Sequence, residues 1–396
     1  MMTDFTKTRA AFHLPEGMTY LDGNSLGPMP RAAADRVATM MADEWSQMLI
    51  TGWNKAGWYV QPRKVGDRIA RLIGAGEGQV VMGDTLSIKV FQAVSAALAL
   101  RPDRRVILSD SGNFPSDLYV AEGIARALGA TLRVVEPEAV EAAIGPDLAV
   151  LMLTEVDYRT GRRHDMPALT ARAHEAGALA IWDLAHSAGA VDVDLLGADA
   201  DFAVGCTYKY LNGGPGAPAF IWTHPRHAEV AEPILQGWMG HAAPFAFDQE
   251  YRPAPGIERM RVGTPPVIAL SALEASLDIW DMVDMAALRA RSIELTEAFI
   301  AGVEAACPDL VLNSPRDPLR RGSQVGFRHP QGYAVMQALI AAGVVGDFRA
   351  PDVLRFGFAP LYNDLDDVSQ AVDTLARILR DGSWDSAEFH RKAAVT

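Results

Sequence analysis

The sequence predicts an α/β fold in which a mostly parallel sheet is buried between two layers of helices. Two observations predict it: short apolar runs recur from about residue 78, and helix-like stretches separate them. Strands that are apolar on both faces and alternate with helices are typical of a parallel sheet covered on both sides. The predicted strands are 79–82, 105–109, 131–135, 148–153, 178–182 and 201–204, and the helical stretches include 87–100, 116–127 and 167–176.

A change of pattern after residue 265 predicts a second, smaller α+β domain. A long helical stretch at 265–305 comes first, and a last helix at 364–380 has an apolar face and begins after Asp364, a residue type that caps helices. Between them lie strand-like segments at 310–313, 323–327, 344–347 and 353–358. Residues 1–45 have no place in the sheet pattern, so we expect them to pack with the small domain. The expected boundaries are 46–285 for the large domain and 1–45 plus 286–396 for the small one.

Length, charge and cysteine content narrow the class of protein. The chain has 396 residues, more than one hydrophobic core usually serves, and a net charge of −13 from 36 basic and 49 acidic residues. A field of that sign repels nucleic acid and anionic membranes. Cys206 and Cys307 form neither a disulfide framework nor a metal-ligand spacing, and no apolar run suggests a secretory signal or a membrane span. We expect a cytoplasmic protein that binds no metal, no nucleic acid and no membrane.

The residues best placed for chemistry lie between 181 and 222. Asp183 ends a predicted strand, His186 follows it, and Lys209 comes after the next strand. Ligands of parallel sheets bind at these carboxyl ends. A buried lysine can form a Schiff base, and a neighbouring Asp can hold the protonated ring nitrogen of pyridoxal phosphate. The glycines in 213–216 would let the backbone turn close to such a cofactor. The alternative is an ordinary salt bridge at the strand ends.

Six motifs carry a resemblance to a known family. They are YLDGNSLGPMP at 20–30, NFPSD at 113–117, TEVDYRTG at 154–161, WDLAHSAGA at 182–190, YKYLNGGPGAPAF at 208–220 and RVGTPPVIAL at 261–270. In this order, the chain resembles the kynureninases, in the class V aminotransferase branch of the fold type I pyridoxal-phosphate enzymes. The resemblance runs from about residue 20 to about residue 365. It implies that fold for the large domain and pyridoxal 5'-phosphate as the cofactor.

The resemblance also implies a role for each matching residue around the cofactor. Lys209 would form the Schiff base and act as the proton-transferring base, Asp183 would hold the pyridinium nitrogen, and Tyr208 is a candidate acid–base group. Thr264 would reach the phosphate across a dimer interface. The alternative for His186 is a purely structural histidine. The alternative for Leu86 and Ser87 is a simple helix cap. The implied cofactor-binding residues are Leu86, Ser87, Phe114, Asp117, Thr154, Asp183, His186, Tyr208, Lys209, Trp238 and Thr264.

Substrate-binding residues are implied in the same way. Arg355 resembles the arginine that clamps the substrate α-carboxylate, a task suited to the bidentate guanidinium. Ser25, next to Asn24, would contact the substrate or would serve the local turn alone. Trp53 and Trp58 lie where the family lines the aryl pocket, and flat indole rings suit stacking on an aniline ring. Which of the two tryptophans faces the substrate stays open.

The implied activity is hydrolysis of L-kynurenine, or of its 3-hydroxy form, to the anthranilate and L-alanine in tryptophan degradation, by a homodimer. One alternative is another β-cleaving or β-eliminating enzyme on this scaffold, such as a 3-acylalanine hydrolase or a cysteine desulfurase. Cys307 lies at an apparent helix end, whereas a desulfurase needs a cysteine on a mobile loop. A noncatalytic pyridoxal-phosphate-binding regulator would need a DNA-binding extension, and a nicotinamide oxidoreductase would need a G-x-G-x-x-G turn after an early strand.

Overall fold

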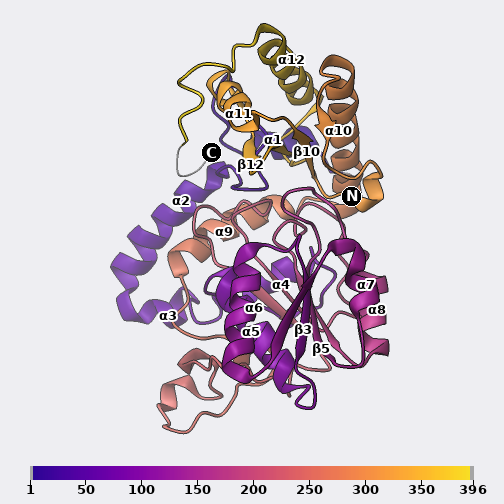
Figure 1. The fold of residues 1–396 in the computed structure, drawn as a ribbon. Coiled ribbons are helices and arrows are strands. Elements are labelled where there is room, and N and C mark those ends of the chain that lie inside the picture. The colour runs from indigo at the N-terminus through magenta and orange to yellow at the C-terminus, as the bar shows by residue number, and fades with distance from the viewer. Residues whose placement is uncertain (1–2, 393–396) are drawn as a thin grey trace.

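The computed structural model describes residues 3–392, and its largest element is a seven-stranded sheet (Figure 1). The strands are β2 Val80–Met82, β3 Val106–Asp110, β4 Thr131–Val135, β5 Leu148–Thr154, β6 Leu179–Asp183, β7 Phe202–Gly205 and β8 Phe220–Thr223. Their order is β2-β8-β7-β6-β5-β3-β4. Strands β3 to β7 are parallel to one another, and only β8 runs against its neighbours β7 and β2. The predicted mostly parallel α/β fold is confirmed.

Helices cover both faces of this sheet. One face packs against α5 Leu86–Ala99 and α6 Pro115–Leu128, and the other against α4 Gln61–Ala70, α8 Met166–Glu175 and α9 Val267–Trp280. Figure 1 shows the sheet between α5 and α6 on one side and α8 with the short α7 Val140–Ala143 on the other. Strand β5 is buried along its whole length, and from Val150 to Leu153 its side chains alternate between the two apolar clusters. The continuous apolar runs in the sequence therefore reflect a sheet that is covered by helices on both faces.

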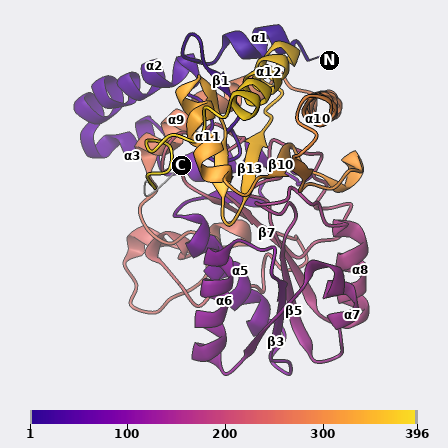
Figure 2. The same cartoon turned by 45° about the horizontal axis from the view of Figure 1, so that its top comes forward.

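A second sheet forms the centre of the small domain. Its strands are β9 Val311–Leu312, β10 Gln324–Arg328, β12 Asp347–Arg349 and β13 Val353–Gly357, in the antiparallel order β12-β13-β10-β9. They pack against α10 Met285–Ala306, α11 Gly332–Ala341 and α12 Leu365–Asp381 (Figure 2). As predicted, Asp364 caps α12: its side chain accepts the backbone N–H groups of Asp366 and Asp367. The helix ends at Gly382, whose φ of 64° is left-handed.

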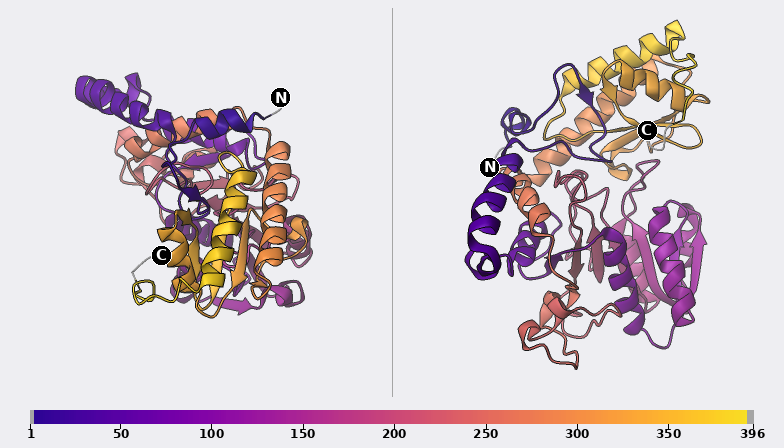
Figure 3. Two further views of the ribbon diagram at one scale, coloured as in Figure 1. Left: turned by 90° about the horizontal axis from the view of Figure 1, so that it is seen from above. Right: turned by 90° about the vertical axis from the view of Figure 1, so that its left-hand side faces the viewer.

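The N-terminal segment contacts both parts of the molecule. It holds α1 Phe5–Ala10, β1 Thr19–Tyr20, α2 Arg31–Thr39 and the π-helix η1 Met40–Met48, followed by η2 Leu49–Thr51 and α3 Gly52–Lys55. Strand β1 pairs with β11 Val344–Val345 of the small domain, whereas α2 packs on α9 of the large one. Figure 3 shows α2 standing out from the body of the molecule. The boundaries at residues 45 and 285 stay a prediction.

The structure differs from the sequence prediction in several elements. The expected single helix at 265–305 is two helices, α9 and α10. The second begins after Asp284, whose side chain caps α10 by accepting the Ala287 N–H. Strand β8 and helix α11 were not predicted, and β8 is only a short run after a Gly- and Pro-rich segment. Short 3₁₀ turns complete the chain: η3 Pro137–Ala139, η4 Trp238–Gly240, η5 Pro244–Ala246, η6 Gly256–Met260 and η7 Pro318–Arg320. Within residues 3–392, every helix is too short or too polar to cross a membrane.

Candidate active site

The carboxyl ends of β5, β6 and β7 open into a cavity of about 260 Å³. Thr154 and Asp183 are the last residues of β5 and β6, and Lys209 follows β7 in the connection to β8. All the predicted cofactor-binding residues except Trp238 and Thr264 line this cavity. They are Leu86, Ser87, Phe114, Asp117, Thr154, Asp183, His186, Tyr208 and Lys209. Sheet topology thus gathers residues that are more than a hundred positions apart in the chain.

Lys209 faces a buried histidine. Its Nζ lies 2.9 Å from Nε2 of His186, and Nδ1 of His186 lies 2.9 Å from Oε1 of Gln324. The Lys209 ammonium position is also 5.8 Å from the ring centres of both Phe114 and Tyr208. Burial, then the charges of Lys209 and Arg355, hold the pKa of His186 well below its usual range. His186 is therefore a neutral imidazole beside the lysine.

Two carboxyl groups share the opposite wall. Burial raises the pKa of Asp183 to about 6, although Lys209 and the Ala185 N–H, 2.9 Å from Asp183 Oδ1, both act to lower it. Burial and the neighbouring Asp183 raise the pKa of Asp117 well above its usual range. Asp117 Oδ2 is buried and has no hydrogen-bond partner within the described chain. The raised pKa values show that both carboxylates lack stabilising donors, so an N–H cation placed beside this wall would stabilise their ionised form.

The far end of the cavity is built for an anion. Helix α5 begins at Leu86, and its N-cap residue Thr85 makes no side-chain cap, so the first backbone N–H groups stay available. The hydroxyl of Ser87 lies 2.9 Å from the hydroxyl of Ser116, which is the second residue of α6. Gly216 closes the opposite side. Amides at a helix start together with two hydroxyl groups form a typical phosphate cradle.

The predicted carboxylate clamp lies beside the cavity, in a cluster of charged groups. Arg355 is fully buried: its Nε donates to Asp347 Oδ1 at 2.7 Å, its Nη2 donates to Ser25 Oγ at 2.8 Å, and its Nη1 donates to the Tyr158 carbonyl. Arg349 Nη2 reaches the same Asp347 carboxylate at 2.6 Å. Ser25 and Arg355, both predicted to bind substrate, thus meet around one aspartate. Asn24 lies nearby, with its Nδ2 3.4 Å from Gln324 Oε1.

Besides Ser25 and Arg355, four further predicted residues lie outside the cavity. Trp58 is packed, since its indole contacts Gly52 and donates from Nε1 to Glu44 at 2.8 Å, and Trp53 lies edge-on against it. Trp238 and Thr264 are exposed. Ring contacts join these regions: Tyr59 packs on Phe245, and Phe245 packs on Trp238. Tyr59 follows Trp58 in the chain, so these contacts connect the region of Trp53 and Trp58 with Trp238. The roles of all four residues stay predictions.

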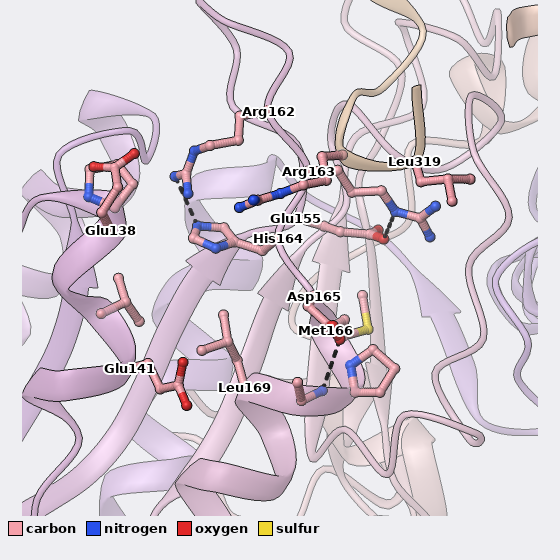
Figure 4. A pocket seen from close by; sticks show the side chains of 15 residues that line it. Glu138, Glu141, Glu155, Arg162, Arg163, His164, Asp165, Met166, Leu169 and Leu319 are labelled. Carbon is pink, nitrogen blue, oxygen red and sulfur yellow. Dashed lines mark hydrogen bonds and ion pairs between the residues drawn. The ribbon is translucent and has the colours of Figure 1, made fainter. Parts of the chain in front are cut away.

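A larger hollow of about 680 Å³ lies on the other side of the β5 end (Figure 4). None of the predicted cofactor residues lines it in the described part of the chain. Some of its charged groups pair with one another: Arg162 contacts His164 and the buried Asp110, and Arg163 donates to Glu155 at 2.8 Å. The larger volume of this hollow therefore does not make it the reactive cavity, because the residues suited to the cofactor line the smaller one.

Comparison with known proteins decides the family. A family model described as the kynureninase C-terminal domain matches residues 288–375. Kynureninase of Burkholderia pseudomallei (strain 1106a) is 52% identical, over 98% of this chain and 95% of its own. Kynureninase of Pseudomonas fluorescens is 51% identical, with the same coverage of both chains. The chain belongs to the kynureninase family. The resemblance predicted from the sequence motifs is confirmed.

The fold of this kynureninase family member is also similar to the folds of solved structures. The cysteine desulfurase CsdA of Escherichia coli has a TM-score of 0.78 at 20% identity, over 96% of this chain and 99% of its own. A mutant of C-DES with glycine covalently linked to its pyridoxal-phosphate cofactor has a TM-score of 0.79 at 17% identity, over 93% and 98% of the two chains. At such identities the likeness concerns the fold alone, and it confirms the predicted fold type I class.

Several residues at this kynureninase site were not predicted. Ser116 belongs to the NFPSD motif, and a hydroxyl at the start of a helix could have indicated it. Cys206 and Tyr158 also line the cavity. Gln324 and Asp347 come from the small domain, where a lone amide and a lone carboxylate on short strands carry no local signal.

Proposed function

We propose that this chain hydrolyses L-kynurenine to anthranilate and L-alanine with pyridoxal phosphate as its cofactor. One observation carries the proposal: Lys209 lies in a cavity with the Asp117 and Asp183 carboxyl pair on one wall and a helix N-terminus at the end. The identity of more than half of all residues to curated kynureninases supports the same activity.

The residues present fit the cofactor. The unpartnered Asp117 Oδ2 and the raised pKa of Asp183 leave a place for a protonated ring nitrogen, and the α5 start with Ser87 suits a phosphate. Phe114, which is 44% exposed, offers a free ring face beside Lys209. When bound, pyridoxal phosphate supplies an electron sink for carbon–carbon bond cleavage.

Proton transfers are assigned to Lys209 and Tyr208. Lys209 is the proposed base at the substrate α-carbon, since its Nζ is oriented by His186 at 2.9 Å. Cys206 and burial raise the pKa of Tyr208, so its phenol keeps its proton at neutral pH and can donate it near the substrate carbonyl. A neutral His186 between these groups avoids a second positive charge beside the lysine.

The substrate carboxylate is assigned to the cluster around Arg355. Asp347 stays ionised, because the charges and hydrogen bonds of Arg355 and Arg349 outweigh its burial and lower its pKa. Burial and Asp347 raise the pKa of the nearby Asp22 to about 7, so Asp22 is partly neutral. Two guanidinium groups therefore face one ionised carboxylate, Asp347, and a partly neutral Asp22, and the surplus positive charge favours an incoming carboxylate.

We assign the working unit to a homodimer whose sites are shared between subunits. Apolar side chains at 47% to 76% exposure, namely Met41, Trp45, Leu49 and Ile50, line η1 and η2 beyond the protruding α2. Patches of this kind mark interfaces, and closed two-fold dimers are the commonest assembly. Trp238 and Thr264 are exposed and lie outside their own chain's cavity, which fits contacts to a partner's phosphate.

Mixing two inactive variants tests the shared site. Lys209→Ala and Thr264→Ala chains should form hybrid dimers in which one site combines an intact Lys209 with an intact Thr264. Activity after subunit exchange should exceed that of either variant alone. A monomer by light scattering, or hybrids no more active than their parents, would contradict the arrangement.

The hydrolysis itself is tested with purified protein and added cofactor. The absorbance band of the covalent cofactor linkage should form, and anthranilate fluorescence should appear on addition of L-kynurenine; the 3-hydroxy substrate in parallel decides the preference. Sulfide release from cysteine without anthranilate release would favour a desulfurase. Both cysteines are buried and form no disulfide, which fits a reducing cytoplasmic location. Burial also raises the pKa of Cys307, so neither buried thiol is a ready nucleophile.

A further inference from the structure

Gln324 reaches from the small domain into the active site. It is 1% exposed, at the first position of β10. Its Nε2 lies 3.0 Å from the carbonyl oxygen of Asp157 and 2.9 Å from that of Tyr158, and its Oε1 lies 2.9 Å from Nδ1 of His186. Carbonyl oxygens only accept hydrogen bonds, so the amide NH₂ group has to face the two carbonyls. The amide oxygen therefore has to face the histidine.

This orientation decides where His186 carries its proton. An amide oxygen accepts only, so Nδ1 of His186 has to be the N–H donor in this bond. In a neutral imidazole the other nitrogen then has a free lone pair. That nitrogen, Nε2, lies 2.9 Å from Lys209 Nζ and accepts a hydrogen bond from it. Asn24 Nδ2, which can only donate, is 3.4 Å from the same Oε1 and is compatible with this orientation alone.

We propose that Gln324 is a positioning residue that selects the Nδ1–H tautomer of His186 and thereby orients the Nζ of Lys209. The same side chain ties the small-domain strand β10 to the loop after β5, so the position of the small domain is transmitted to the lysine. Its effect on catalysis rests on the proposed function, whereas the tautomer does not. The charged groups that act on His186 are Lys209, Arg355 and Arg349, and all three disfavour a charged imidazole.

The tautomer is measured directly on the full chain by long-range ¹H–¹⁵N correlation with ¹⁵N-labelled histidine. The His186 signal is identified by its loss in His186→Gln. Wild type should show Nδ1 protonated and Nε2 bare, and Gln324→Met should populate the Nε2–H form. Gln61→Met is the matched control: Gln61 is 5% exposed and hydrogen-bonded to Ser271, outside the cavity. An Nε2–H form in wild type, or an unchanged tautomer in Gln324→Met, would overturn the proposal.

Gln324→Glu provides a second variant that keeps an acceptor for His186. It should retain the Nδ1–H tautomer, and the negative charge of its carboxylate should raise the pKa of His186. Loss of the tautomer in this variant would contradict the role given to the amide oxygen.

The kinetic consequence is measured on the enzyme loaded with cofactor. Loss of the bond should lower kcat by about 10- to 100-fold with little change in KM, as for other residues that orient a reactive side chain. The pH dependence of the cofactor-linkage absorbance should shift in Gln324→Met and not in Gln61→Met. A changed tautomer with unchanged kcat would overturn the link to Lys209. Absence of kynurenine hydrolysis in wild type would instead count against the proposed function and leave the tautomer result standing.

Discussion

Asp183 and Asp201 lie at opposite ends of two neighbouring parallel strands, and their environments are opposite as well. Asp183 ends β6, whereas Asp201 directly precedes β7, and they are 3% and 0% exposed. Burial raises the pKa of Asp183 to about 6. For Asp201, hydrogen bonds from His174 and His227, among others, outweigh burial and lower the pKa far below its usual range.

The count of donors explains the contrast. Asp201 accepts from His174 at 2.8 Å, from His227 at 2.7 Å, from the Ala180 N–H at 2.8 Å and from Arg226 at 2.6 Å. Asp183 accepts one backbone N–H and a hydrogen bond from the neighbouring Asp117 carboxyl. A buried carboxylate with all its acceptor positions filled stabilises the fold, whereas a buried carboxyl left short of donors marks a place where a ligand completes the site.

The largest expected effect comes from removing Lys209, the cation beside Asp183. Lys209→Ala should abolish kynurenine hydrolysis and the absorbance band of the covalent linkage, because a Schiff base needs a primary amine. The fold should persist. Anthranilate fluorescence and borohydride reduction followed by mass spectrometry check this; a reducible cofactor adduct on the variant would show that another lysine is used.

Exchanging the two aspartates for asparagine should separate the two roles. Asp183→Asn should lose about 100-fold or more in kcat and keep its stability, because a neutral amide does not hold a protonated ring nitrogen. Asp201→Asn should lose about 3–5 kcal/mol of unfolding free energy, because it breaks a buried charged network, while the folded fraction keeps its kcat. Urea unfolding and steady-state kinetics on both variants measure this. A fully active Asp183→Asn would remove the contrast.

Arg355 tests a third buried carboxylate, Asp347, which is satisfied like Asp201 yet lies beside the substrate. Arg355→Met should cost about 2–4 kcal/mol in kcat/KM, because a buried charged pair and the proposed carboxylate clamp are both lost. The loss should be equal for kynurenine and its 3-hydroxy form, since both carry the same carboxylate. A loss confined to one of the two substrates would assign Arg355 to the aryl end instead.

The smallest effect is an opposite pH dependence of stability in the cofactor-free protein. The unfolded pKa of aspartate is about 3.9. Asp183 has a higher folded pKa, so its cost to stability should appear as the pH rises from about 4 through about 6, and Asp183→Asn should gain relative to wild type over that range. Asp201 has a lower folded pKa, so its contribution should be complete above about pH 4 and decline below it. Denaturant midpoints across pH measure both; parallel curves for the two variants would contradict the contrast.

Much of the large domain could be predicted because its strands are buried on both faces. The run 148–153 matches β5, and the strand ends predicted that Asp183 and Lys209 face one crevice, where both line the cavity. Thr154 was implied by the resemblance and lines the same cavity. Strand β8 was missed, since a run of only four residues (FIWT) after a Gly- and Pro-rich turn carries little periodicity. The break before α10 was also missed, although Asp284 is a typical N-cap.

The second layer of the site could not be predicted from local patterns. Gln324 and Asp347 act through contacts with His186 and Arg355 that depend on how the small domain docks on the large one. Trp58 illustrates the reverse case: its residue type suits an aryl pocket, yet in this chain its ring packs on Gly52. Side-chain chemistry indicates what a residue can do, and only long-range packing decides what it contacts.

The pairing of β1 with β11 has a consequence for how the protein is made. Thr19 and Tyr20 leave the ribosome long before their partners Val344 and Val345 are synthesised. At about 5–20 residues per second, the delay is on the order of 15 to 60 s. During that time the strands of the large sheet can pair, while the N-terminal segment has no strand to join. That segment later places the Gly27 N–H 2.8 Å from the Tyr208 carbonyl oxygen, next to Lys209. Completion of the active site is therefore a late event in biosynthesis.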